Sequence, residues 1–322
     1  MAKLFQSKTD ISVNLNCYTI RLKERNTFDN FLEIKDVYHN LSFLEIVKKF
    51  VAELDVESYV NPTNDRIFYI EKTLSLSDTL YTAIIRKGHS GHETNIDEIQ
   101  KKKATKISTI KVGQFSTIPF FLLLCQPTNN SKVIILITQS YKQFGFKEIF
   151  QEAFTTFSKK HFNFNDITCE FGTLSISKLF EEYVNKGSIR KLRFIQNMLP
   201  TNMENLVADE QDDNDPKSYS VELRITAKTK GFMGIKKNIR FENNSFMELY
   251  KIDGFEYQEV VADVSLAGRK RVLNISKPSD FSASYDLTKV AEVNPETNHP
   301  NFEKVNKEAI DILNNDLIPN IT

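Results

Sequence analysis

The amino-terminal part of the chain alternates between two hydrophobic patterns, one typical of strands and one typical of helices. Segment 11–23 alternates apolar and polar residues, which predicts a half-buried antiparallel strand. Segment 40–54 places apolar residues at helical spacing, which predicts an amphipathic helix. Further strands are expected at 65–73, 79–88 and 105–112.

The centre of the chain carries the strongest pattern. Segments 118–127 and 132–140 are nearly continuous apolar runs joined by the turn-rich tetrapeptide TNNS. Runs of this kind lie in the middle of a sheet whose two faces are both covered. Segment 144–162 then repeats phenylalanine at helical spacing, and we interpret this stripe as core rather than as a cofactor site. A strand at 167–175, a helix at 176–185 and a strand at 189–195 follow.

An acidic tract separates this part from the rest. Residues 203–216 contain six acidic residues and no basic one, which indicates a solvated linker. Beyond it we expect strands at 219–228, 235–242, 258–266 and 270–276, a short helix near 245–252 and a closing helix at 301–317. The predicted fold class is α+β, with a mixed or antiparallel sheet and packed helices followed by a second, smaller β-rich α+β domain. The boundaries are 1–204 for the first domain, 205–218 for the acidic linker and 219–322 for the second domain with its closing helix.

Composition narrows the function classes. Lys and Arg number 42 and Asp and Glu also number 42, so any attraction to a polyanion must come from local patches. Only ten glycines in 322 residues argue against a glycine-rich nucleotide-binding fold. The three cysteines are far apart in apolar surroundings, and the longest apolar run is too short for a membrane helix. We therefore expect a cytoplasmic protein.

The search for catalytic chemistry finds weak candidates. Segment 86–93 contains His89, His92 and Glu93, but its glycines and the preceding strand favour exposed loop histidines over a zinc or ribonuclease site. His161 and His299 have no evident catalytic partner in the sequence. Glu222 and Arg224 form E-x-R, a poor match to the E-x-K of metal-dependent nucleases. No phosphate loop or nucleophile elbow is present, so we predict no catalytic residue, no metal site and no cofactor.

Basic clusters are the better lead. Between Lys217 and Arg240 the chain holds seven basic residues against Glu222 alone, around a predicted hairpin turn at residues 231–234. Two more clusters lie at 186–194 and 268–272, and a fourth at 101–106 is expected to form a loop. Such patches can neutralise phosphates, or they can be solvated faces balanced by the acidic tract. The candidate nucleic-acid contacts are Arg190, Lys191, Arg193, Arg224, Lys228, Lys230, Lys236, Lys237, Arg240, Arg269, Lys270 and Arg271.

The order of elements resembles a known family. The strand IFYIEK (67–72), a charged segment, the strand PFFLLL (119–124), a second apolar strand and the junction QFGFKEIF (143–150) resemble the RexA-like and KwaB-like proteins of phage exclusion and anti-phage defence. The resemblance covers residues 65–200. It implies a cytoplasmic DNA-binding protein that acts with a membrane-embedded partner, and it implies that the basic clusters contact DNA.

The hypothesis from the sequence is a non-enzymatic DNA-binding protein of a phage-defence or exclusion type. It would be a homodimer or other homo-oligomer and would bind the phosphate backbone with little sequence preference. Two alternatives stay open. One is a metal-dependent nuclease or toxin using Glu222 or the His89 and His92 segment. The other is a protein-interaction subunit of a defence complex, docking through the acidic tract.

Overall fold

The computed structural model describes most of the chain, in segments. They are residues 12–27, 30–91, 93–100, 103–142, 144–162, 164, 166–174, 177–197, 220–227, 241–242, 245–246, 252, 255–266, 269–277 and 284–321. The chain divides into two compact units, one formed by Met1–Leu174 with Asp286–Thr322 and the other by Ser175–Tyr285. This division differs from the boundary at 205–218 that the sequence suggests.

Two elements explain the difference. Strand β10 (Ser188–Gln196), expected in the first domain, forms antiparallel ladders with β11 (Val221–Thr226) and β14 (Glu259–Leu266). Helix α5 (Phe302–Ile312), expected in the second domain, packs against β7 (Ser116–Cys125) of the first unit. Both elements bury apolar side chains against strands that are distant in the sequence. Hydrophobic periodicity predicts that an element is buried, but it does not predict which element it packs against.

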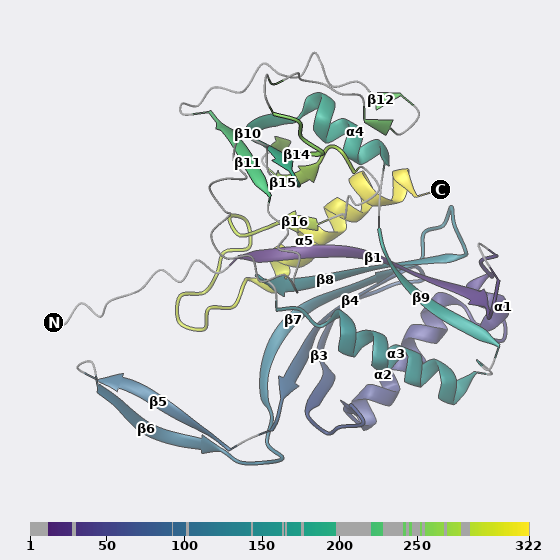
Figure 1. Ribbon diagram of the computed structural model, residues 1–322. Helices are drawn as coiled ribbons and strands as arrows, with labels where there is room; N and C mark the ends of the chain where they lie inside the picture. The colour runs from purple at the N-terminus through teal and green to yellow at the C-terminus, as the bar shows by residue number, and fades with distance from the viewer. Residues whose placement is uncertain are drawn as a thin grey trace, which may run out of the picture. The chain divides into compact units, whose positions relative to one another are not determined.

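The first unit is built around an eight-stranded sheet that curls on itself (Figure 1). Its order is β16-β1-β8-β7-β4-β3-β2, with β9 also paired to β1, and every pairing with a described register is antiparallel. The remaining strands are β1 (Val13–Glu24), β2 (Tyr59–Val60), β3 (Arg66–Leu76), β4 (Leu80–His89), β8 (Val133–Tyr141), β9 (Ile167–Thr173) and β16 (Ser284–Asp286), which spans the boundary between the two units at Tyr285 and Asp286.

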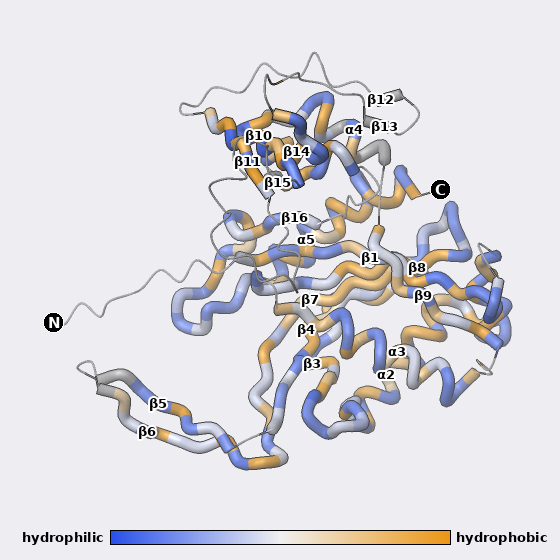
Figure 2. The backbone as a smooth tube through the Cα atoms, in the orientation of Figure 1, coloured by the Kyte–Doolittle hydropathy of each residue, from blue (hydrophilic) through white to orange (hydrophobic). Residues whose placement is uncertain are grey.

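Both faces of this sheet are covered. Strands β7 and β8 are buried over almost their whole length, as their continuous apolar sequences predict, and Figure 2 shows hydrophobic residues concentrated on these central strands. Helices α2 (Phe43–Val56) and α3 (Lys147–His161) lie on one face, and α5 lies on the other (Figure 1). A π-helical turn (Leu313–Leu317) and a 3₁₀ turn (Ile318–Asn320) continue α5.

The phenylalanine stripe of α3 is core, as predicted. Phe50 of α2 meets Phe150, Phe154 and Phe157 edge-on, with ring centroids 6.0, 5.4 and 5.2 Å apart. Such pairs contribute about 0.5–1.5 kcal/mol each beyond their burial. Helix α2 begins where Ser42 and Glu45 form a reciprocal capping box, which satisfies backbone N–H groups of the first turn. The short helix α1 (Ile34–Val37) precedes it.

A two-stranded ribbon stands apart from this sheet. Strands β5 (Thr94–Gln100) and β6 (Lys103–Ile110) pair only with each other and project away from the sheet (Figure 1). The sequence predicts a strand at 105–112 but none over β5, because β5 is mostly polar and lacks the alternation of a half-buried strand.

The second unit contains a four-stranded sheet of order β11-β10-β14-β15, where β15 is Arg269–Asn274. Helix α4 (Ser177–Lys186) packs against β14. Strands β12 (Phe241–Glu242) and β13 (Ser245–Phe246) form a separate short pair. Ser245–Phe246 is therefore strand where the sequence suggests the start of a helix, and residues 247–251 lie outside the described segments.

Candidate nucleic-acid interface

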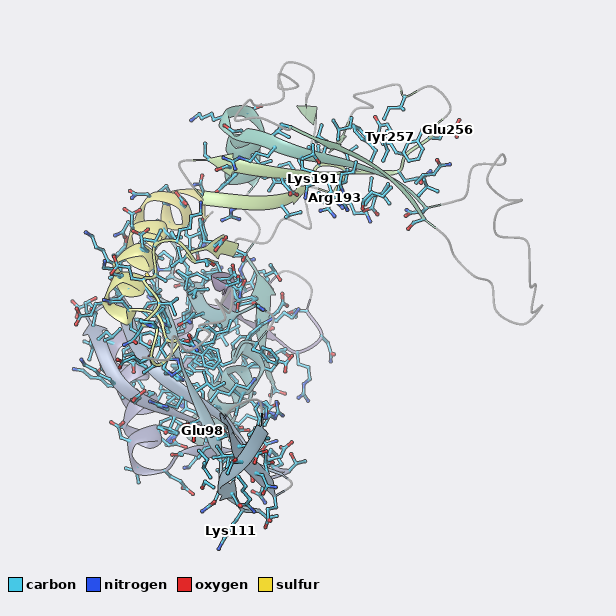
Figure 3. The ribbon with its side chains drawn as sticks, turned by 90° about the vertical axis from the view of Figure 1, so that its left-hand side faces the viewer. Glu98, Lys111, Lys191, Arg193, Glu256 and Tyr257 are labelled. Carbon is cyan, nitrogen blue, oxygen red and sulfur yellow. The ribbon has the colours of Figure 1, made fainter. Side chains whose placement is uncertain are left out.

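Alternation along β10 places its basic side chains on one face of the four-stranded sheet. Leu192 and Phe194 are buried, whereas Lys191 and Arg193 are half-buried on the opposite, outward face. Successive strand residues point to opposite faces, so this separation follows from the sequence once the strand forms. Figure 3 labels Lys191 and Arg193, which lie near each other on this face.

The register of β11 adds a third basic side chain to the outward face. Arg193 is paired with Arg224, and Lys191 is paired with Thr226. Arg224 is exposed, and its Nε donates to the Glu222 carboxylate at 3.0 Å. Because directly opposite residues share a face, Lys191, Arg193, Arg224 and Glu222 stand together.

Asp263 on β14 is the second acid of this face. Its carboxylate lies 3.3 Å from Lys191 Nζ and 4.0 Å from Arg193 Nη2. Arg190 is exposed at the β-bulge between Ile189 and Lys191. The outward basic face, defined here as Arg190, Lys191, Arg193 and Arg224 with Glu222 and Asp263, therefore carries four basic side chains against two carboxylates.

The structure corrects the prediction for Arg271. This residue is 7% exposed, and its guanidinium lies over the rings of Tyr183 and Tyr285, at 4.8 and 4.0 Å from their centroids. It is paired with Val264, a buried residue of β14, so it belongs to the covered face of the sheet. We therefore remove Arg271 from the predicted phosphate contacts.

The other candidates fall partly outside the described segments. Arg269 and Lys270 lie in β15, and only their backbone is described. The predicted hairpin contacts Lys228, Lys230, Lys236, Lys237 and Arg240 lie outside the described residues, as does the acidic tract 203–216.

The catalytic candidates are described only in part. His89 is exposed at the end of strand β4, opposite Arg66 and Ser116, whereas His92 lies outside the described segments. Partial burial lowers the pKa of His89, and the cations of Lys87 and Arg66 lower it further. In the part of the chain that the structure describes, no three His, Cys, Asp or Glu side chains form a group that could hold a metal ion.

The sequence suggests no partner for His161, and the fold supplies one. Its Nε2 contacts the carboxylate of Glu53 on α2, which Lys160 Nζ also binds at 3.0 Å. Partial burial raises the pKa of Glu53, but the hydrogen bonds from His161 and Lys160 outweigh it and leave that pKa lowered. The interaction links residues 108 positions apart, so no sequence signal could have found it.

A pocket of about 210 Å³ lies beside this ion pair. Phe50, Leu54 and Phe157 are among its apolar lining residues, and Glu53 is part of its polar lining. The Glu53 carboxylate is thus already bound by the Lys160 and His161 side chains of α3, and these contacts link α2 to α3 next to the pocket.

Neither a protein-family model nor a curated protein sequence matches this chain. No helix in the described segments combines the length and the apolar character needed to cross a membrane.

Proposed function

We propose that this chain is a non-enzymatic nucleic-acid-binding protein that holds the phosphate backbone of DNA on the outward basic face. The observation that carries the proposal is the pairing of Arg193 with Arg224 beside Lys191 and Arg190. Like charges directly opposite each other destabilise a sheet, and the two carboxylates of this face, Glu222 and Asp263, are fewer than its four cations. A bound polyanion removes that repulsion.

The face suits phosphate rather than bases. Its cations are spread over two strands and a bulge on the sheet surface. This spread lets them contact successive phosphates along a nucleic-acid strand. Contacts to phosphate oxygens position a protein without reporting the sequence. Binding of this kind has little sequence preference and weakens steeply as salt rises, because each neutralised phosphate releases counterions.

The setting of the proposal follows the resemblance of residues 65–200 to RexA-like and KwaB-like proteins. The proposal is accordingly a cytoplasmic protein of a phage-defence or exclusion system that acts with a membrane-embedded partner, and we propose separately that it is a homodimer. The two-domain organisation belongs to the same proposal, with the outward basic face on the smaller, β-rich part.

Fluorescence anisotropy of the full chain tests the binding. Labelled duplex DNA, single-stranded DNA and RNA are titrated from low to high salt. We expect tight duplex binding at low salt. In a plot of the logarithm of the binding constant against the logarithm of the salt concentration, the negative slope should become shallower by about 0.9 for each phosphate that a variant no longer binds. Arg193→Glu and Arg224→Glu should lower both affinity and slope, whereas Lys289→Glu, an exposed lysine on the first unit, should not. Flat traces with all three ligands, or equal effects of the three variants, would overturn the proposal.

A further inference from the structure

The ribbon formed by β5 and β6 leaves most of its described side chains exposed to water. We define the ribbon arm as residues 94–111. From Thr94 to Glu98 and from Ala104 to Ser108, all side chains are exposed, including Ile96 at 40% and Ile107 at 61%. Figure 3 shows Glu98 and Lys111 on this projecting element. The arm therefore contributes no core to the unit from which it extends.

An element of this kind is stable only marginally by itself. A single two-stranded hairpin in water lacks the hydrophobic face that a third strand or a packed helix would bury. The arm nevertheless keeps a ladder from Thr94 opposite Ile110 to Gln100 opposite Lys103, with one bulge after Ile96. A ligand that covers the ribbon would supply the missing burial.

The chemistry of the arm matches a polyanion. Its sequence holds five lysines and two acids, and Asp97 stands opposite Lys106. Hydroxyl and amide side chains, which bond to phosphates and base edges, fill many other positions. Ile96 has Thr94 and Glu98 as neighbours on its own face and Ser108 opposite, so it does not begin the apolar core typical of protein interfaces.

We propose that the ribbon arm is a second nucleic-acid contact that enters a groove of duplex DNA. The proposal rests on the proposed function and adds the duplex groove as the feature recognised. The major groove admits a two-stranded β-ribbon. Lys106 and Lys111 then contact the phosphates that flank the groove, and the polar side chains of the ribbon face base edges and sugars.

Two sets of variants test the arm. Lys106→Glu with Lys111→Glu reverses the charge of the two arm lysines whose side chains the structure describes, and Lys132→Glu, an exposed lysine in the turn between β7 and β8, is the control. In the second set, Asn-Gly replaces residues 95–109. Thr94 and Ile110 are directly paired, so a two-residue turn can join them. Circular dichroism melting should match the wild type, because none of the removed side chains that the structure describes is buried.

The readouts are anisotropy with duplex and single-stranded DNA across salt, and light scattering for the mass of the protein. We expect both arm variants to bind duplex DNA more weakly and to show a salt slope lower by about 0.9 for each phosphate that they no longer bind, while single-stranded binding changes less. Unchanged duplex binding in both arm variants, with wild-type binding intact, overturns the arm alone. A smaller assembly with duplex binding unchanged also overturns it and assigns the arm to a second copy of the chain. Absence of binding by the wild type instead overturns the proposed function.

Discussion

Arg193 on β10 lies directly opposite Arg224 on β11, and both side chains stand on the outward face of the four-stranded sheet. Side chains at such positions have Cβ atoms about 4.5–5.5 Å apart, close enough for like charges to repel. Two carboxylates offset the repulsion: Glu222 accepts from Arg224, and Asp263 lies near Lys191 and Arg193. The acids of this face are therefore the residues whose removal should change binding with the least damage to the fold.

Asp263→Asn should strengthen nucleic-acid binding. The change frees Lys191 and Arg193 from their shared carboxylate, so both cations become available to phosphate. Partly exposed ion pairs contribute up to about 1 kcal/mol, so the free energy of unfolding should change by no more than that. In anisotropy titrations with duplex DNA, the salt concentration at which half of the DNA is released should be higher for the variant than for the wild type.

The control for this change is Glu256→Gln. Glu256 is an exposed acid of the same unit, labelled in Figure 3, and it lies outside the outward basic face. If both variants shift the salt midpoint equally, net charge rather than the geometry of Asp263 explains the effect.

Arg271→Ala should destabilise the second unit and spare binding by the folded protein. Its guanidinium is buried over two tyrosine rings, and a desolvated cation–π interaction contributes about 2 kcal/mol. Urea unfolding followed by circular dichroism measures the decrease in stability. Arg190→Ala is the matched variant, because Arg190 is exposed and should show the opposite pattern, with weaker binding and a stability change within about 0.5 kcal/mol.

Gly88→Ala should destabilise the first unit by about 1–3 kcal/mol, the usual cost of overpacking. A Cβ at Gly88 would lie 2.7 Å from Thr117 Cγ2, 2.8 Å from Ile67 Cγ2 and 3.0 Å from the Ser116 carbonyl oxygen. Gly145→Ala is the control, because its Cβ would meet Ser140 Cβ at an ordinary 3.5 Å. Equal melting temperatures for the two variants would contradict this account of the β3–β4–β7 packing.

His299→Gln should flatten the pH dependence of stability below neutral pH. Burial lowers the pKa of His299 from 6.5 and the cation of Arg86 lowers it further, against a smaller opposing effect of Glu71. As pH falls below 6.5, the unfolded chain therefore takes up this proton before the folded protein does, and folding stability declines. Without the imidazole, that part of the decline disappears.

Urea unfolding at a series of pH values from neutral to mildly acidic gives the slope for wild type and variant. His89→Gln should act in the same direction, because the pKa of His89 is also lowered. A variant slope identical to that of the wild type would show that the His299 imidazole has no part in the decline.

The elements of the first unit could be predicted well from the sequence where the pattern was local. The apolar runs of β7 and β8 and the phenylalanine stripe of α3 each carry their own signal of burial. Strand β5 carries no such signal, because a strand exposed on both faces leaves no hydrophobic periodicity. The partner of His161 was equally hidden, since Glu53 lies on another helix.

For the candidate site, the sequence by itself determined that basic residues cluster at 190–193 and 269–271 and that alternate residues of each strand face opposite ways. Only the tertiary structure decided which face meets water. The pairing of Arg271 with Val264 turns Arg271 toward the covered side, and the pairing of Arg193 with Arg224 gathers charge on the open side. Side chains alternate with a period of two, so a register shift of one residue would move each of these side chains to the opposite face of the sheet. Register is set by contacts between distant strands, and the local sequence therefore cannot specify it.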